Sequence, residues 1–531
     1  MSINTKNYDL SLIAKKPWIF LIIIGLGGIL LRLYHFPFDI PVFGDAVAYF
    51  WYANDISILG KFPEGHVTQT LGTTPTNNGW PGILSIFFSL LNSNNFLDYI
   101  NLQRLVTVSF SVLTIIPIYL LTKKFLEKPY AILCAAIFIF SPRIIENSLL
   151  GITEPLFILL LVSSVLLFLN DKKYLIFCSF AIVALSSLIR YEGLLILVPF
   201  TIIFFLRFKI KKITVLNYFI IIGIILIIIS PMIAIRIDTT GNDGLVTHIL
   251  SGPQYYVNQN TENDGIIFHF LEKGSFFLLK NLIYVSIPMF FIFIPYGIFE
   301  LFRNRNHEKI TLISFGVAFL FPAFYAASRG FEETRYLFIL YPIFCLMAGY
   351  TIRKIDRKIN RTNLLFYATL ACVIICSVIS TDFMINDYYD NDKEFYLIAK
   401  DIHQLTTTVN RDYEGLMFLM WTDDEINERF PLLYSELGKD LNTHTNIVSL
   451  GKNTKNNFEN LNDYLEYSKT QKMTHLILNG YNLDTKFLQE IFNNEKDYPY
   501  LNKIYDSSEL GFTNHVKIFQ IDYEKFSDSK K

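Results

Sequence analysis

Carboxylate and guanidinium side chains that could do chemistry gather in four short segments of this sequence. In the first segment, Phe43-Gly44-Asp45-Ala46, a carboxylate follows an apolar run. A carboxylate at such a boundary can accept a proton from a nucleophile held beside it, which is general base catalysis. An Asp after a Gly is also a common helix cap, so Asp45 is a candidate for either role.

The second segment holds Arg143 and Glu146 at helical spacing, followed by Glu154 in a Thr-Glu-Pro triplet. The two glutamates are candidates for binding a sugar or a cation. A structural explanation is also open, because Arg143 and Glu146 can pair on one helix face. Thr153 and Pro155 likewise suit the first positions of a helix.

The third and fourth segments supply arginines. Arg190 and Glu192 lie between two apolar runs, where charges are costly unless they are paired or face an aqueous cavity. They are therefore expected either to pair with each other or to contact a ligand. Arg335 precedes another apolar run, and its planar guanidinium is suited to holding a phosphate with help from Arg329. Contact of these arginines with lipid head groups is the alternative.

His66 is the histidine that we single out as a candidate ligand or acid-base group, although no partner stands at metal-ligand spacing. The sequence contains no paired CxxC motif, no phosphate-binding P-loop and no nucleophile elbow. The metal is therefore unknown, no cofactor is certain, and a divalent cation at the acidic residues is left open.

The composition indicates the environment in which these groups work. Of 531 residues, 52% are hydrophobic and only 18% are charged, which is too apolar for an ordinary soluble protein. The formal net charge of −1 lacks the basic excess of a nucleic-acid binder. All five cysteines fall in apolar runs, so no disulfide framework is expected. We expect an integral membrane protein.

Apolar runs long enough to cross a bilayer begin near residues 18, 105, 131, 155, 174, 193, 214, 276, 310, 335 and 364, which predicts about eleven transmembrane helices. Lysine and arginine concentrate in alternate connections, which the positive-inside rule assigns to the cytoplasm. This places the N-terminus in the cytoplasm and all four chemical segments on the extracytoplasmic side. The membrane is expected to be the cell (plasma) membrane.

The predicted domains are a transmembrane module at residues 1–381, with a long first outer loop at 34–104, and an extracytoplasmic α/β domain at 382–531. In this tail the apolar runs predict strands and the amphipathic stretches predict helices. The predicted strands are 415–420, 446–450, 474–478 and 516–521, and the predicted helices are 392–404, 458–470 and 485–492.

The order of these motifs resembles the polytopic glycosyltransferases of the C structural class, specifically the branch of protein O-mannosyltransferases and aminoarabinose transferases (the family 39 or 83 type). The resemblance rests on Gly44-Asp45, Trp80-Pro81-Gly82, Thr153-Glu154-Pro155, Arg190-Tyr191-Glu192-Gly193 and Arg335-Tyr336-Leu337. It covers about residues 18–350.

The resemblance implies transfer of a sugar from a polyprenyl- or dolichyl-phosphate donor, with inversion at the anomeric carbon. It implies that Asp45 is the catalytic base and that Arg335, aided by Arg190 or Arg329, neutralises the departing phosphate. Glu154 and Glu146 would contact sugar, acceptor or a cation.

Several alternatives stay open. Protein O-mannosyltransferases usually carry an Asp-Glu pair in the first loop, but Ala46 follows Asp45 here, so the acceptor is a protein, a glycan or a lipid. An oligosaccharyltransferase is the nearest rival, although its Trp-Trp-Asp-Tyr-Gly signature is absent from the tail. A membrane transporter and a non-enzymatic scaffold are the alternatives from other classes.

Overall fold

The architecture comes from a computed structural model of the 531-residue chain. The structure describes residues 11–63, 78–93, 95–244, 247, 266–287, 289–303, 306–331, 333–359, 364–408, 418–421, 448–449, 458, 460–470, 475–480 and 486–529. The chain divides into two compact units. Residues Met1–Phe36, Ala48–Asn92 and Ile100–Ile385 form the first, and Pro37–Val47, Ser93–Tyr99 and Asn386–Lys531 form the second.

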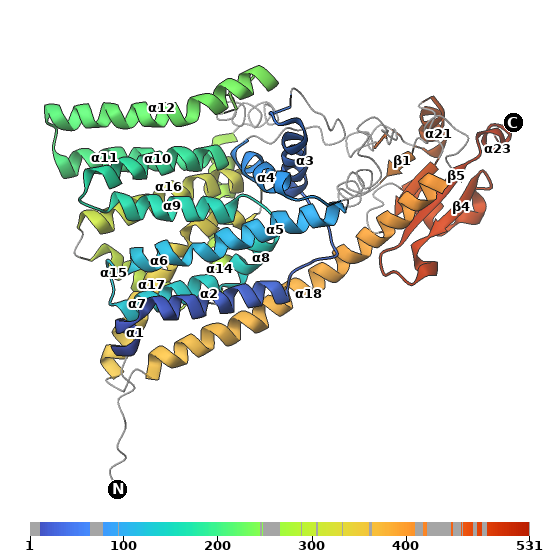
Figure 1. Ribbon diagram of the computed structural model, residues 1–531. Helices are drawn as coiled ribbons and strands as arrows, with labels where there is room; N and C mark the ends of the chain where they lie inside the picture. Colours follow the sequence, from blue (N-terminus) through green and yellow to red (C-terminus); the bar gives the residue numbers. More distant parts are fainter. Residues whose placement is uncertain are drawn as a thin grey trace, which may run out of the picture. The chain divides into compact units, whose positions relative to one another are not determined.

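The first unit is built of helices, many of which run side by side (Figure 1). Proline at the first turn starts several of them, because its missing N–H would have no partner there. The helices from the N-terminus to the middle of the chain are α1 (Ser11–Lys15), α2 (Pro17–Tyr34), α3 (Asp45–Leu59), α4 (Gly79–Leu90), α5 (Phe96–Leu113), α6 (Ile115–Thr122), α7 (Lys128–Ile139), α8 (Pro142–Leu149), α9 (Glu154–Phe168) and α10 (Lys173–Ile189). The first residues of α3 and of α5 belong to the second unit.

The later helices of this unit begin with a short 3₁₀ helix, η1, which continues directly into α11. A second 3₁₀ helix, η2, leads into α17 in the same way. These elements are η1 (Tyr191–Ile196), α11 (Leu197–Phe208), α12 (Lys212–Thr240), α14 (Ile266–Ser286), α15 (Ile294–Phe302), α16 (His307–Ser328), η2 (Thr334–Leu340), α17 (Tyr341–Ile359) and α18 (Leu364–Thr408), the last of which continues into the second unit.

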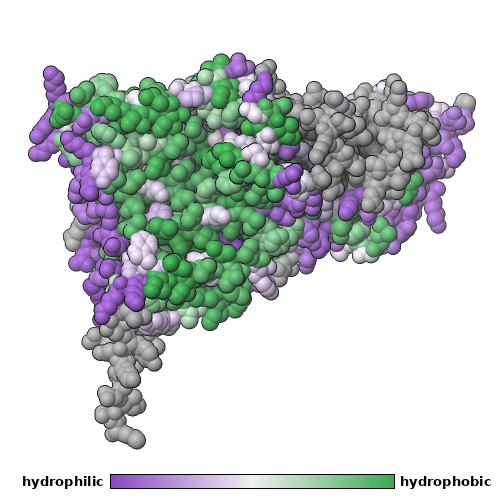
Figure 2. Space-filling model, in the orientation of Figure 1, coloured by the Kyte–Doolittle hydropathy of each residue, from purple (hydrophilic) through white to green (hydrophobic). Residues whose placement is uncertain are grey.

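Among the described residues, seven helices are long and apolar enough to cross a membrane, or eight if the bent pair α7 and α8 forms one span. Three shorter apolar helices, α4, α9 and α10, accompany them. Figure 2 shows a broad hydrophobic face over this unit, bordered by hydrophilic residues at the margin where α11 ends and α12 begins. Each predicted apolar run begins in a helix, whereas the predicted number of about eleven spans stays a prediction.

A buried arginine holds the bend between α7 and α8. Arg32, near the end of α2, is fully buried and donates to the carbonyl oxygen of Ile139 at 3.0 Å and to Ser148 Oγ at 2.9 Å. It also donates to Ser111 Oγ at 3.1 Å and to the Gly28 carbonyl at 3.0 Å. Ile139 is the last residue of α7, so the guanidinium meets a carbonyl that the bend leaves free from the helical ladder.

The second unit contains a five-stranded sheet with the strand order β2-β1-β3-β5-β4. The strands are β1 (Phe418–Trp421), β2 (Val448–Ser449), β3 (His475–Asn479), β4 (Leu501–Asp506) and β5 (Val516–Ile521). β1 pairs in parallel with β2 and β3, whereas β5 is antiparallel to β3 and β4. In register, Leu476 faces Phe519 and Leu419 faces Val448.

Short helices complete this unit: α21 (Leu461–Thr470), α22 (Lys486–Asn493), η3 (Glu495–Asp497), η4 (Ser507–Leu510) and α23 (Tyr523–Asp528). Their apolar faces and the sheet share one core, which contains Tyr464, Leu465, Leu488 and Phe519, all fully buried. Helices and strands therefore occur where the sequence predicts them in the tail, and β4 is an additional strand.

Candidate functional site

Three of the predicted segments meet around the guanidinium of Arg190, which follows the last residue of α10. Its Nη2 lies 2.9 Å from Glu192 Oε1, and its Nη1 pairs with Glu154 Oε1 at the start of α9. Both carboxylates are buried, Glu154 at 4% exposure and Glu192 at 7%. Buried carboxylates are costly unless they are paired, so this arginine and its two glutamates stabilise one another.

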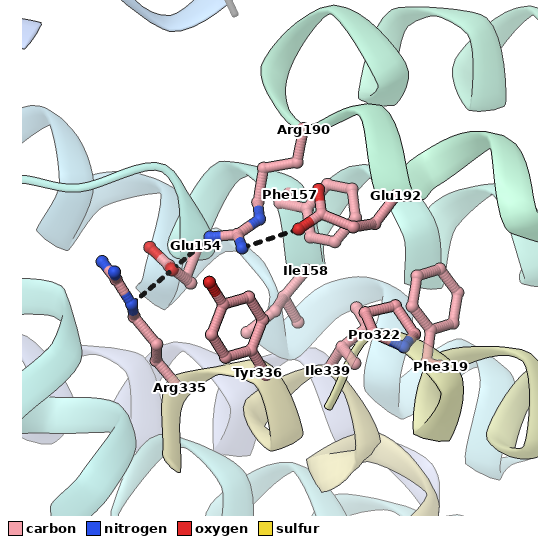
Figure 3. Close-up of a pocket in the computed structure, with 10 residues that line it drawn as sticks. All are labelled: Glu154, Phe157, Ile158, Arg190, Glu192, Phe319, Pro322, Arg335, Tyr336 and Ile339. Carbon is pink, nitrogen blue, oxygen red and sulfur yellow. Dashed lines mark hydrogen bonds and ion pairs between the residues drawn. The ribbon is translucent and has the colours of Figure 1, made fainter. Parts of the chain in front are cut away.

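Arg335, in η2, joins this cluster from a third element (Figure 3). Its Nε lies 3.9 Å from Glu154 Oε1 and also pairs with Glu333. Tyr336 brings its ring to the same place, with the Arg190 guanidinium carbon 5.3 Å from the ring centroid. Arg335 is less tightly enclosed than Arg190, with side-chain exposures of 22% and 14%, and its contact with Glu154 is longer.

A small cavity lies beside these charges. Its free volume is about 20 Å³, enough for about one water molecule. One oxygen of Glu192, Oε2, is buried and has no hydrogen-bond partner in the described part of the chain, so it can accept a bond from a ligand hydroxyl. The cavity is lined by Glu154, Phe157, Ile158, Arg190, Glu192, Phe319, Pro322, Arg335, Tyr336 and Ile339.

Glycines set how closely the surrounding elements approach. A Cβ on Gly79, at the start of α4, would lie 2.4 Å from the carbonyl oxygen of Leu188, two residues before Arg190. A Cβ on Gly193, in η1, would lie 2.5 Å from Ser186 Oγ. Both positions therefore exclude larger residues, and the backbone that carries Arg190 is fixed from two sides.

Thr153 and Pro155 start α9 as expected, with Thr153 at the N-cap and Pro155 in the first turn. The Thr153 hydroxyl, however, does not cap the helix backbone, and it instead lies 3.2 Å from Glu154 Oε2 and 3.4 Å from Arg190 Nη1. This threonine therefore belongs to the charge cluster, and it helps to orient the Glu154 carboxylate.

Glu146 does not line the cavity. It pairs with Arg143 at 3.3 Å on α8, the i to i+3 pair that the spacing predicts. Arg143 also lies over the ring of Tyr284, with its guanidinium carbon 4.2 Å from the centroid. A ligand-binding role for Glu146 stays a prediction.

The remaining predicted residues lie elsewhere. Arg329 follows the last residue of α16, near the rings of Tyr325 and Phe331, and is not among the cavity residues. Asp45 is the first residue of α3, after Gly44 with φ of +58°, and it belongs to the second unit. His66 falls outside the described residues. The roles of these three residues stay predictions.

No group of three or more His, Cys, Asp or Glu residues is placed to hold a metal ion in the described ranges. At the charge cluster, both glutamates are already occupied by Arg190. These carboxylates therefore serve to hold the guanidinium groups, and a role for them in binding a divalent cation stays a prediction.

Two features of this site were not predicted from the sequence. The first is the ion pair between Glu333 and Arg335. The two residues lie in one charged segment, so their closeness in the sequence was the available signal. Tyr336 and Phe157 place rings beside Arg190, at 5.3 and 5.9 Å from its guanidinium carbon. Tyr336 follows Arg335 directly in the sequence, and this position could have predicted that its ring lies near the charges.

Two groups of solved structures share the fold of this chain. ArnT from Cupriavidus metallidurans in the apo state has a TM-score of 0.59 and 8% identity, covering 96% of this chain and 98% of ArnT. The oligosaccharyltransferase from Archaeoglobus fulgidus, crystallised with Zn and sulfate, has a TM-score of 0.55 and 13% identity, covering 93% of this chain and 72% of that protein. At such identities the likeness shows the fold alone.

A further structure of Cupriavidus ArnT, bound to undecaprenyl phosphate, matches with a TM-score of 0.54 and 9% identity over 95% of this chain and 98% of ArnT. No curated protein matches the chain by sequence. The model of the Alg9-like mannosyltransferase family matches residues 81–420. Because this match spans more than half of the sequence and includes Glu154, Arg190 and Arg335, the chain belongs to the Alg9-like mannosyltransferase family and is a membrane glycosyltransferase.

Proposed function

We propose that this enzyme transfers a mannose-like hexose or a related sugar from a polyprenyl- or dolichyl-phosphate donor to a protein, glycan or lipid acceptor. The reaction takes place at the extracytoplasmic face of the cell membrane, with the N-terminus in the cytoplasm and the C-terminal α/β domain outside. The single observation that carries the proposal is the cluster of Arg190, Arg335 and Glu154 beside a cavity with a ring and an unpartnered carboxylate oxygen.

The leaving group in this reaction is a lipid phosphate, whose charge grows as the bond from C1 to oxygen breaks. Arg335 is the better of the two arginines for binding it, because its side chain is more exposed and its partner Glu333 is itself half-exposed, so a phosphate can displace that carboxylate. A planar guanidinium can donate two parallel bonds to phosphate oxygens. Stabilisation of charge that develops only in the transition state lowers the barrier directly.

Arg190 has a different part in the proposal. Glu154 and Glu192 hold its guanidinium in place, so it acts as a fixed positive charge. Glu192 keeps Oε2 for a hydroxyl of the sugar, and Tyr336 offers a ring face against which a sugar can pack. Because the cavity holds about 20 Å³, the donor must widen it by displacing side chains as it binds.

Asp45 is the proposed general base. The acceptor oxygen attacks C1 from the side opposite the phosphate, the bond from C1 to the phosphate oxygen breaks, and its electron pair stays on the phosphate. Because the attack comes from the opposite side, the configuration at C1 is inverted, and Asp45 takes the proton of the acceptor hydroxyl. Its exposed position at the start of α3 is compatible with access by an acceptor.

The donor class is also supported by the solved relatives. One solved structure shows ArnT bound to undecaprenyl phosphate, and another shows the archaeal oligosaccharyltransferase in complex with an inhibitory peptide and a dolichol-phosphate. An enzyme of the oligosaccharyltransferase type is the second candidate, because that fold also matches. It would transfer a whole oligosaccharide to a peptide rather than a single sugar.

The test is sugar transfer in membranes that contain the full-length protein, supplied with a panel of radiolabelled polyprenyl-phosphate sugars. Asp45→Asn and Arg335→Ala are each expected to lower transfer by about 100-fold or more. Asp497→Asn, an exposed carboxylate of the second unit, and Arg303→Ala, an exposed arginine, are the matched controls and should transfer normally. Full activity of Asp45→Asn would reject the proposed base, and transfer only from oligosaccharide donors would favour the second candidate.

A further inference from the structure

A second and larger cavity lies between α10, α11 and α12. Its free volume is about 190 Å³, compared with about 20 Å³ at the candidate site. α10 and α12 pack against each other, and the cavity opens where α11 ends and α12 begins. It is lined by Lys173, Ile176, Phe177, Phe204, Phe208, Lys211, Ile213, Thr214 and Asn217.

This cavity is far from the candidate site. Lys173 is the first residue of α10 and Arg190 directly follows its last residue, so the 17-residue helix separates them by about 25 Å. That distance is close to the hydrocarbon thickness of a bilayer. By the positive-inside rule this end of α10 faces the cytoplasm, so the cavity serves neither the proposed donor nor the acceptor.

The charge at the cavity is positive and not neutralised by the protein. Neither Lys173 nor Lys211 forms an ion pair within the described chain, and Lys172, Lys209 and Lys212 flank them in sequence. The neighbouring acid, Asp171, is turned outward with its side chain 98% exposed, and it pairs with Arg207. An anion in the cavity would meet two ammonium groups without competition from a buried carboxylate.

The backbone adds to this field. α10 and α12 both begin here, with Lys172 and Lys211 at their N-caps, without a side-chain cap and without an acid in the first turn. Cations at a helix N-terminus are unfavourable, because the helix dipole is positive there. An anion beside the two lysines would remove this repulsion and meet backbone N–H groups that lack helical partners.

The rest of the lining is apolar. Phe177, Phe204 and Phe208 face the cavity, together with Ile213 on α12. From there α12 continues as a long apolar helix, most of which is not buried by the rest of the protein. The exposed Leu216 and Phe219 lie on the next turn. The surroundings therefore suit a ligand with an anionic head and a long apolar chain.

We propose that this cavity binds one anionic phospholipid of the cytoplasmic leaflet, with the headgroup phosphate between Lys173 and Lys211. The amide of Asn217 donates a further hydrogen bond to the headgroup, and an acyl chain lies along the exposed face of α12. Basic pockets between transmembrane helices on the cytoplasmic side are a known form of lipid recognition. The site is independent of the proposed function, since it lies at the opposite end of α10.

The test uses the full-length protein purified in a non-ionic detergent and incubated with phosphatidylglycerol or phosphatidylcholine, with retained lipid counted by native mass spectrometry. The natural protein is expected to retain phosphatidylglycerol but not phosphatidylcholine. The double variant Lys173→Ala, Lys211→Ala should retain at least about fivefold less. The control Lys123→Ala, Lys358→Ala removes two other exposed lysines and should retain as much as the natural protein.

A second variant guards against loss of folding. Asn217→Trp keeps both lysines but fills the cavity, and it should also lose phosphatidylglycerol. Equal retention by the natural protein and by both variants would overturn the proposal. Displacement of the lipid by an equimolar amount of inorganic phosphate would overturn it as well, since the site would then recognise free phosphate and not a lipid.

Discussion

The cations near the two ends of α10 differ in whether the protein neutralises their charge. At one end Arg190 is enclosed by Glu154 and Glu192, and its charge is balanced by the protein itself. At the other end Lys173 and Lys211 line a cavity without an ion pair in the described part of the chain. Both ends are bordered by aromatic rings, so the carboxylates make the difference.

This contrast indicates two kinds of site. Paired charges in a small cavity are held in fixed positions. They need little rearrangement when a transition state forms, and this property suits catalysis. Unpaired lysines are flexible and attract an anion without being arranged for one geometry, which suits binding of a headgroup. A helix of this length can thus separate a reacting site from a lipid site.

The largest effect is expected from Arg190→Ala. Transfer should fall by about 100-fold or more, because a fixed positive charge beside the phosphate is lost. The free energy of unfolding should fall by about 3–5 kcal/mol, because Glu154 and Glu192 are left buried without their partner. Radiolabelled sugar transfer and thermal unfolding in detergent measure the two effects.

The double variant Arg190→Ala, Glu154→Gln separates the two roles. It should regain part of the lost stability, because one buried charge is removed with its partner. It should not regain transfer. Recovery of transfer in the double variant would mean that Arg190 serves only to neutralise Glu154. The proposed role of Arg190 in transfer would then be wrong.

An intermediate effect is expected from Gly193→Ala. The new Cβ would lie 2.5 Å from Ser186 Oγ and 3.1 Å from backbone atoms, so the turn that carries Glu192 must shift. Such overpacking costs about 1–3 kcal/mol, and transfer should fall by about tenfold. Gly223→Ala, on α12, is the control because nothing lies within 4 Å of its Cβ.

Removing the hydroxyl that causes the clash sharpens this test. The pair Gly193→Ala, Ser186→Ala should recover part of the transfer rate. Phosphatidylglycerol retention should be normal in Gly193→Ala, in the control Gly223→Ala and in the double variant. A loss of lipid retention in Gly193→Ala would show that the two ends of α10 are coupled.

The smallest effect is expected from Arg207→Ala at the lysine-bearing end. Arg207 donates to the carbonyl oxygens of Phe168 and Asn170, each at 2.8 Å, and pairs with the exposed Asp171. Its loss should cost about 1–2 kcal/mol in the free energy of unfolding, and transfer should stay within about twofold of the natural rate. A loss of transfer as large as that of Arg190→Ala would contradict the independence of the two ends.

The sequence predicts the members of the charge cluster better than their mutual contacts. The alternation of basic connections assigns Glu154, Arg190, Glu192 and Arg335 to one side, and these four residues do meet. Their mutual pairing depends on how closely α9, α10 and η2 approach, which the sequence pattern does not specify. Glu146 was grouped with them because it was predicted on the same side of the membrane. It lies on α8 and pairs with Arg143.

The same limit applies in the second unit. β3 and β5 were predicted from short, mostly apolar runs, and both are buried along most of their length. β4 was missed because two adjacent polar residues, Asn502 and Lys503, interrupt its apolar sequence. Its pairing with β5 also shifts register between Lys503 and Tyr505, so a strict alternation does not hold.

The buried Arg32 has a consequence for the biosynthesis of the protein. The ribosome completes α2 long before Ser148, which lies 116 residues later, so the guanidinium first emerges without most of its partners. A cation that faces lipid alone is costly, and it must stay near the aqueous interface until those partners arrive. Crosslinking of α2 to α5 in chains truncated before Ser148 should therefore be weak. α2 is thus synthesised early but is among the last helices to reach its final orientation.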